Sequence, residues 1–176
     1  MRVMGIDPGL ARTGYGVIER KGGLLTILAV GTARAPAGQP PSVQLMNLCL
    51  ELERVMDRTE PDVVAVEKLF FNSNVRTAIR VGQASGVALL AAAECGAPVV
   101  EYTPTEVKRA VTGVGNATKD QVGYMIRKLL RMKEPPDSPD AADALAIAIC
   151  HANAQPMRDA IAKADGKPAL RVVKAE

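Results

Sequence analysis

Residues 1–30 read MRVMGIDPGLARTGYGVIERKGGLLTILAV, and this stretch decides the fold. It contains short apolar runs rich in β-branched residues, which we expect to form strands at Val3–Ile6, Gly14–Ile18 and Leu24–Val30. Pro8-Gly9 and Gly22-Gly23 separate these runs, and such pairs are typical of tight turns. Because tight turns join antiparallel neighbours, the stretch predicts a three-stranded antiparallel meander.

Strands and helices alternate after residue 30. Apolar residues at helical spacing predict a helix over Leu45–Met56, and Val63–Val66 is an apolar run typical of a strand covered on both faces. The pattern continues with a helix at Val75–Cys95, a strand at Val99–Tyr102, and helices at Thr105–Val111, Lys119–Met132 and Pro139–Asn153. This order predicts the α/β class: a five-stranded mixed sheet, an antiparallel meander plus parallel strands, flanked by helices.

Length and composition predict one domain. With 176 residues, 48% of them hydrophobic, the chain can bury one core, which we assign to residues 1–154. Residues 155–176 are a low-hydrophobicity mixture of Ala, Lys, Asp and Gly, and we expect a disordered tail there. We find no targeting segment and no run near the roughly 18 apolar residues of a membrane helix, so we expect a cytoplasmic protein without a membrane partner.

Charge and cysteine content are weak functional signals. The net charge of +3 favours nucleic acid only slightly. Cys49, Cys95 and Cys150 lie far apart in the sequence, each in an apolar helical context. This pattern is typical of reduced thiols in a core, and it indicates neither a disulfide framework nor a zinc site.

Four acidic residues are candidates for a catalytic metal site: Asp7, Glu67, Asp140 and Asp143. Asp7 and Glu67 each close a predicted strand, although an Asp-Pro-Gly turn or a solvated strand end would account for either one alone. Asp140 follows Ser138 and Pro139 at a predicted helix start, where the helix dipole by itself favours an acid.

Asp143 is harder to explain as a structural residue. It lies in AADALAIAI (residues 141–149), a helix apolar on nearly every face, so we expect its side chain to be buried. A buried unpaired carboxylate costs several kcal/mol, and no basic residue lies near it in its own helix. A metal ion is an economical partner, with Asp140 on the same face at i, i+3. Oxygen ligands without clustered His or Cys favour Mg²⁺ or Mn²⁺, and two such ions about 3.5–4 Å apart catalyse phosphodiester hydrolysis.

Aromatic and basic residues near these acids are candidates for DNA binding. Phe70 and Phe71 follow Glu67, and an aromatic beside a metal site can stack on bases, although both residues would also suit a core. The basic candidates are Arg76 and Arg80 at helical spacing, Lys108, and Lys119 after the small-residue loop 113–118. A solvated surface position is the ordinary alternative for each of the four basic residues.

Five motifs occur in order along the chain: Gly5-Ile6-Asp7-Pro8-Gly9, Val66-Glu67, Gly82-Gln83-Ala84, Val107-Lys108 and Asp140-Ala141-Ala142-Asp143-Ala144-Leu145-Ala146. Their order and spacing resemble the RuvC family of Holliday-junction resolvases, from about Met1 to His151. The resemblance implies an RNase H-like fold in which Asp7, Glu67, Asp140 and Asp143 are the catalytic, metal-binding residues. The implied cofactor is Mg²⁺, two ions per active site, with Mn²⁺ able to substitute.

The same resemblance implies further roles and partners. Phe70 contacts bases near the crossover, and Lys108 and Lys119 belong to the active-site cleft, whereas Phe71 has no match in the family pattern. The family acts as a homodimer on four-way junction DNA, with the helix around Gly82–Gly86 near the dimer interface. It works alongside branch-migration proteins of the RuvAB type.

We therefore expect a Mg-dependent crossover junction endodeoxyribonuclease. Such a hydrolase resolves four-way junctions by paired symmetric nicks during recombination and repair, and leaves 5′-phosphate and 3′-hydroxyl ends. Three alternatives stay open: an RNase H-like nuclease for another substrate such as RNA–DNA hybrid, a non-catalytic junction-binding protein, and an ATP-binding protein of the actin and sugar-kinase type. The last needs two similar lobes, for which the chain is short.

Overall fold

The computed structural model describes residues 1–34, 38–68 and 75–164, with residues 156–164 described by their backbone alone. The described residues form a five-stranded sheet of order β3-β2-β1-β4-β5. Its strands are β1 (Arg2–Asp7), β2 (Arg12–Lys21), β3 (Leu24–Arg34), β4 (Val63–Glu67) and β5 (Val99–Tyr102). The pairs β1–β2 and β2–β3 are antiparallel, whereas β4 runs parallel to β1 and to β5. The predicted meander plus parallel strands is confirmed.

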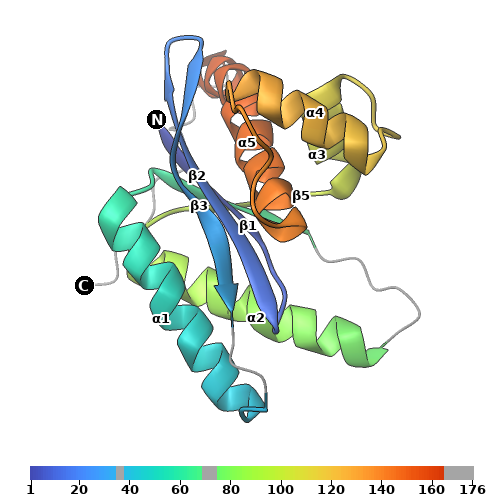
Figure 1. The fold of residues 1–176 in the computed structure, drawn as a ribbon. Helices are drawn as coiled ribbons and strands as arrows, with labels where there is room; N and C mark the ends of the chain where they lie inside the picture. The colour runs from blue at the N-terminus through green and yellow to red at the C-terminus, as the bar shows by residue number, and fades with distance from the viewer. Residues whose placement is uncertain (35–37, 69–74, 165–176) are drawn as a thin grey trace.

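Helices cover both faces of this sheet (Figure 1). One face carries α1 (Pro41–Thr59) and α2 (Val75–Glu94), and the other carries α3 (Pro104–Thr112), α4 (Lys119–Leu129) and α5 (Pro139–Ala164). Because successive strand residues point to opposite faces, β1 contributes side chains to the hydrophobic cores on both faces of the sheet. Val3 packs in the core under α3, α4 and α5, whereas Met4 and Ile6 pack in the core under α1 and α2.

Local sequence signals explain where α3 and α4 begin. Each helix starts with a capping box, in which a threonine hydroxyl accepts the backbone N–H of the residue three positions later and that residue's side chain accepts the threonine N–H. The pairs are Thr103 with Glu106 and Thr118 with Gln121. The second box places Lys119 at the first position of α4.

Two glycines let α5 lie directly against the sheet. A Cβ atom built on Gly5 of β1 would overlap the carbonyl oxygen of Ala144, and one built on Gly14 of β2 would overlap the carbonyl oxygen of Asp140. The middle of α5 is buried from Ala144 to Ala152. These contacts hold the first turns of α5 over the ends of β1 and β2.

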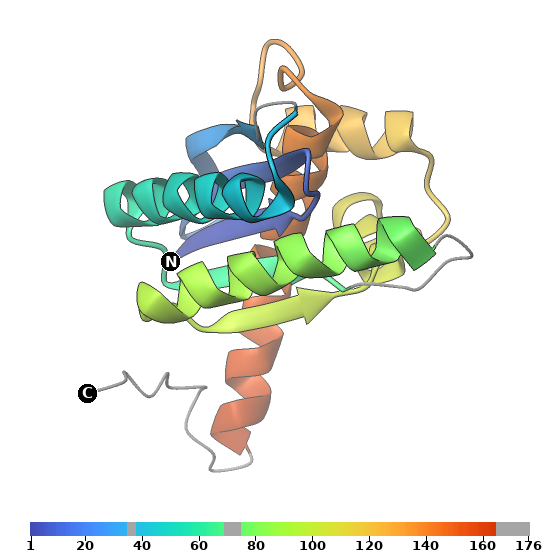
Figure 2. The ribbon, with the colours of Figure 1, turned by 90° about the horizontal axis from the view of Figure 1, so that it is seen from below.

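α5 is longer than its sequence pattern predicted. The expected end at Asn153 is wrong, because the helix continues to Ala164 and its last turns extend beyond the sheet (Figure 2). Alanine, methionine, arginine and lysine after Asn153 are good helix formers, so low hydrophobicity does not end the helix. Residues 165–176 lie outside the described residues, and the division at residue 154 with its disordered tail stays a prediction. No described helix is both long and apolar enough to span a bilayer.

Candidate active site

Asp7 and Glu67 lie side by side at one edge of the sheet. Each is the last residue of its strand, β1 or β4. These strands are parallel neighbours in which Ile6 pairs with Val66, so the next residue of each strand ends at the same edge. This is the edge at which open α/β sheets place their ligands.

Asp140 and Asp143 reach this edge from the first turns of α5. The backbone N–H of Ala141 donates to the hydroxyl oxygen of Ser138 at 3.1 Å, which caps the start of the helix. The same hydroxyl lies 2.6 Å from that of Thr32 on β3, so the start of α5 is tied to the sheet. Together with the close approach at Gly14, these contacts place both acids near Asp7.

The charges of the four carboxyl groups act on one another. The pKa of Asp7 is raised to about 7, first by burial and then by the charges of Glu67, Asp143 and Asp140, in that order. Burial also raises the pKa of Glu67, with Asp143 adding to the rise. Like charges crowded into a partly buried site favour protonation or a bound cation.

Two lysines lie close enough to act on these acids. The Nζ atom of Lys119 is 3.2 Å from Oδ2 of Asp143, and its charge lowers the pKa values of Asp7 and Glu67. The hydrogen bond to Asp143 in turn raises the pKa of Lys119. Lys108 on α3 also lowers the pKa of Glu67. The structure thus brings both predicted lysines to the acidic cluster.

One expectation about Asp143 is wrong. Its side chain is 40% exposed rather than buried, and it has an ion-pair partner, Lys119. The apolar run around Asp143 suggested burial on all sides. The first turns of α5 lie at the edge of the sheet, however, and the Asp143 side chain is partly open to solvent there. The partner comes from α4, which no pattern within α5 could reveal. The argument for a metal therefore rests on the cluster of four acids rather than on Asp143 alone.

Sequence reasoning missed two residues at the start of β2, directly after the loop that follows Asp7. The Nε atom of Arg12 lies 3.7 Å from Oδ2 of Asp140, with the arginine side chain 60% exposed. Thr13 is fully buried, and its hydroxyl accepts the N–H of Gly9 at 3.1 Å and donates to the Gly9 carbonyl at 2.7 Å. Thr13 thereby closes the loop that follows Asp7. The one sequence signal that could have indicated Arg12 and Thr13 is that both lie within six residues of Asp7.

The remaining candidates lie farther along the chain. Arg76 and Arg80 are exposed on the first turns of α2, and neither has a hydrogen bond or ion pair to another described residue. Phe70 and Phe71 lie outside the described residues. The structure therefore does not bring the two arginines into contact with the four acids.

The four acids suit a hard divalent cation. All their donors are carboxylate oxygens, the ligands that Mg²⁺ and Mn²⁺ prefer. No three of them place ligating atoms within 4.8 Å of one another, so a cation must draw the side chains closer. A cation would also relieve the repulsion that raises the pKa of Asp7.

A mixed sheet with this strand order and an acidic cluster at its carboxyl edge defines the class of RNase H-like nucleases. The family model for the crossover junction endodeoxyribonuclease RuvC matches residues 3–151. The RuvC protein of Chloroflexus aggregans is 53% identical over 156 residues, which cover 89% of this chain and 95% of that protein. The chain belongs to the RuvC family of crossover junction endodeoxyribonucleases.

Solved structures agree with this assignment. Thermus thermophilus RuvC in complex with Holliday junction substrate is 38% identical and superposes with a TM-score of 0.86, covering 90% of this chain and 96% of that one. The yeast mitochondrial Holliday junction resolvase Ydc2 is 16% identical, with a TM-score of 0.62 over 92% of this chain and 85% of its own, and so shares the fold. The predicted RNase H-like fold is confirmed.

Proposed function

We propose that this chain resolves four-way DNA junctions by paired symmetric nicks during recombination and repair, leaving 5′-phosphate and 3′-hydroxyl ends. The observation that carries the proposal is the convergence of Asp7, Glu67, Asp140 and Asp143 at one sheet edge of a RuvC-family chain. The Thermus thermophilus relative was solved with a Holliday junction substrate. Because the proposed substrate is chromosomal DNA, we also propose that the protein works in the cytoplasm.

The proposed cofactor is Mg²⁺, two ions per active site, with Mn²⁺ able to replace it. The four acids would hold these ions, which would supply the charge that activates water and stabilises the leaving oxygen in phosphodiester hydrolysis. Asp7 and Glu67 are held by the strand ends, and Asp140 and Asp143 are held by α5. The four carboxylates would therefore approach the ions from two sides. Their repulsion supports a cation rather than a neutral ligand at this edge.

The basic residues are proposed to bind the DNA backbone. Lys119 and Lys108 already face the acids, so a scissile phosphate drawn to the site would meet both positive charges. Arg76 and Arg80 are free on the surface of α2 to contact a neighbouring DNA arm. Phe70 is proposed to contact bases near the crossover, on the basis of the family pattern alone.

We further propose that the chain works as a homodimer through α2. This helix exposes large apolar side chains on its outer surface, namely those of Val75, Ile79, Leu89 and Leu90. Several large apolar side chains exposed along one helix favour an interface there. A two-fold dimer presents one acidic site to each of two symmetry-related strands, which accounts for paired nicks. Branch-migration proteins of the RuvAB type are the proposed partners on the junction.

The decisive experiment is cleavage of an end-labelled synthetic four-way junction in Mg²⁺, in Mn²⁺ and in EDTA, with linear duplex and RNA–DNA hybrid as control substrates. We expect symmetric nicks in the junction that require either metal and produce ends that ligase can seal. Preferential cutting of the hybrid would favour the alternative nuclease, and junction binding without strand breaks in any metal would favour the non-catalytic alternative.

The matched variant is Asp143→Asn. We expect it to bind the junction as the unaltered chain does, while cleavage falls by orders of magnitude because the site loses a metal ligand but keeps its shape. Undiminished cutting by this variant would remove Asp143 from the proposed site.

A further inference from the structure

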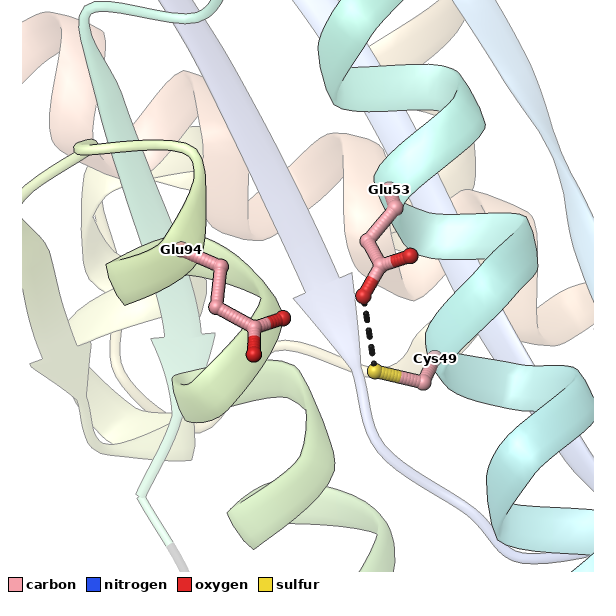
Figure 3. A group of neighbouring side chains, drawn as sticks. All are labelled: Cys49, Glu53 and Glu94. Carbon is pink, nitrogen blue, oxygen red and sulfur yellow. Dashed lines mark hydrogen bonds between the residues drawn. The ribbon is translucent and has the colours of Figure 1, made fainter.

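A second group of ligand-type side chains lies between α1 and α2, on the other face of the sheet from α5. Cys49 and Glu53 are one helical turn apart on α1, and Glu94 is the last residue of α2. Figure 3 shows the two α1 side chains pointing across the gap toward the Glu94 carboxylate. Two helices thus contribute to one cluster.

The three side chains are already close to one another. The Sγ atom of Cys49 donates to Oε1 of Glu53 at 3.1 Å, and one ligating atom from each of the three residues lies within 4.8 Å of the other two. A sulfur and an oxygen donor on one tetrahedral Zn²⁺ ion lie about 3.7 Å apart, given Zn–S and Zn–O distances of about 2.3 and 2.2 Å. Only a small side-chain movement is therefore needed to bring all three donors onto one ion.

The cluster has an excess of acidic groups. No described lysine or arginine comes within ion-pair distance of Glu53 or Glu94. Burial and the hydrogen bond to Glu53 raise the pKa of Cys49 to about 11, and the hydrogen bond to Glu53 raises the pKa of Glu94.

A second thiol adjoins the cluster. Cys95 follows Glu94 and is exposed, so the expectation of a core thiol is wrong for this residue. The charges of Glu53 and Glu94 contribute to the rise of its pKa, after burial and the charge of Asp57. The group itself contains one sulfur and two carboxylate donors from two helices, a set that differs in kind from the all-oxygen set of the active site.

We propose that Cys49, Glu53 and Glu94 bind one zinc-like divalent cation that joins α1 to α2. Thiolate ligands select Zn²⁺ or Co²⁺ over Mg²⁺, and Zn²⁺ accepts mixed sulfur and oxygen ligands in a tetrahedral site. The sequence indicated no zinc site because the ligands are 45 residues apart on separate helices and lack a metal-binding spacing. This site is independent of the proposed nuclease function.

The test is a Co²⁺ titration of the reduced full-length protein, followed by the near-ultraviolet charge-transfer absorption of a thiolate bound to Co²⁺. Carboxylates alone do not produce this band, so Co²⁺ at the active site is silent. With millimolar Mg²⁺ present to compete for the active site, we expect a band that saturates at one equivalent of Co²⁺ and disappears with excess Zn²⁺. Absence of any band would overturn the proposal.

Variants separate the site from binding by an isolated thiol. Cys49→Ser is expected to abolish the band, and Glu94→Gln to weaken Co²⁺ binding about tenfold or more, because one of three principal ligands loses its charge. Cys150→Ala, which alters a buried thiol outside the cluster, should leave the band unchanged. A band unaffected by Glu53→Gln and Glu94→Gln would show an isolated thiol and overturn the site.

Thermal unfolding gives a readout that does not depend on spectra. With millimolar Mg²⁺ present to compete for the active-site acids, Zn²⁺ should raise the Tm of the unaltered protein more than that of Cys49→Ser, because a ligand that binds only the folded state stabilises it by mass action. Circular dichroism of each variant without metal establishes that it folds. An equal Zn²⁺-induced shift in the variant and in the unaltered chain would contradict the proposal.

Discussion

Asp7 lies where burial and three neighbouring carboxylates all disfavour its charged form. The charge of Lys119 opposes this rise without cancelling it. An acid held in this way favours cation binding at the expense of the stability of the metal-free fold. The local chemistry of the site is thus set by individual charges and their separations.

The first residue-scale prediction concerns Asp7→Asn without metal. The folded-state pKa of Asp7 is raised from 3.8 to about 7, so the folded state holds this proton more tightly than the unfolded state. Stability is therefore lost as pH rises from about 4 to about 7 and stays low above that range, by at most about 4 kcal/mol. Asparagine carries no charge, so the variant should be the more stable protein at pH 8.

Urea unfolding in EDTA between pH 4.5 and 8 measures this difference. The stability advantage of Asp7→Asn should grow with pH and level off above about 7. Added Mg²⁺ should stabilise the unaltered chain and shrink the difference. A constant difference at all pH values would contradict the electrostatic account of Asp7.

The second residue-scale prediction concerns Lys119→Ala. We expect cleavage at saturating Mg²⁺ to slow on the order of tenfold or more, because the site loses a positive charge that faces the acids and the incoming phosphate. The control is Lys21→Ala, which removes an equally exposed lysine from the far end of β2. Similar rates for both variants would show that Lys119 matters only as general positive charge.

At the element scale, the acids depend on how closely α5 approaches the sheet. Gly5 and Gly14 allow the α5 backbone to contact β1 and β2, and Ser138 and Thr32 tie its first turn to β3. Side chains at those two glycine positions would push the helix outward. The position of α5 against the sheet therefore sets where Asp140 and Asp143 lie relative to Asp7.

The prediction at this scale concerns Gly5→Ala. Its Cβ would overlap the Ala144 carbonyl oxygen, so α5 must shift, at a cost of about 1–3 kcal/mol or more. The shift moves Asp143 relative to Asp7, and cleavage should fall further than stability alone explains. Denaturant unfolding and single-turnover cleavage measure the two effects.

Gly123→Ala in α4 is the matched control. A Cβ there meets nothing within 4 Å, and alanine favours the helix by roughly 0.5–1 kcal/mol. This variant should be as stable as the unaltered chain or more so, with cleavage unchanged. If Gly5→Ala also retained full stability and cleavage, close packing of α5 would not be required.

At the scale of the whole molecule, paired cutting requires two copies of the site. One chain presents one set of the four proposed catalytic acids, at one edge of its sheet. The exposed apolar side chains of α2 offer the surface for a symmetric partner. Paired nicks are thus a property of the proposed assembly rather than of the fold.

The whole-molecule prediction concerns Ile79→Asp. Ile79 is 57% exposed, so the charge should leave the monomer folded while it disrupts an apolar interface. Sedimentation should show a monomer, and junction cleavage should change from paired to single nicks. Leu24→Asp, at a 44% exposed apolar position in β3, is the control expected to stay dimeric. An Ile79→Asp protein that stayed dimeric would place the interface elsewhere.

The sequence predicted the sheet and two acids well because those signals are local. Apolar runs located the strands, and the rule that parallel strands share a carboxyl edge brings Asp7 next to Glu67. It failed where a contact joins distant segments. The pairing of Lys119 with Asp143 and the position of Arg12 beside Asp140 depend on how α4, α5 and the start of β2 pack together.

By itself, the sequence determined the strand and helix order, the α/β class, and the carboxylates that belong to the family pattern. Alternation of apolar residues and turn chemistry act over a few residues and can be recognised without coordinates. Only the tertiary structure decided the exposure of Asp143, the continuation of α5 to Ala164, and the meeting of Cys49 with Glu94. Exposure and contact between distant residues depend on packing, which brings side chains together regardless of their separation along the chain.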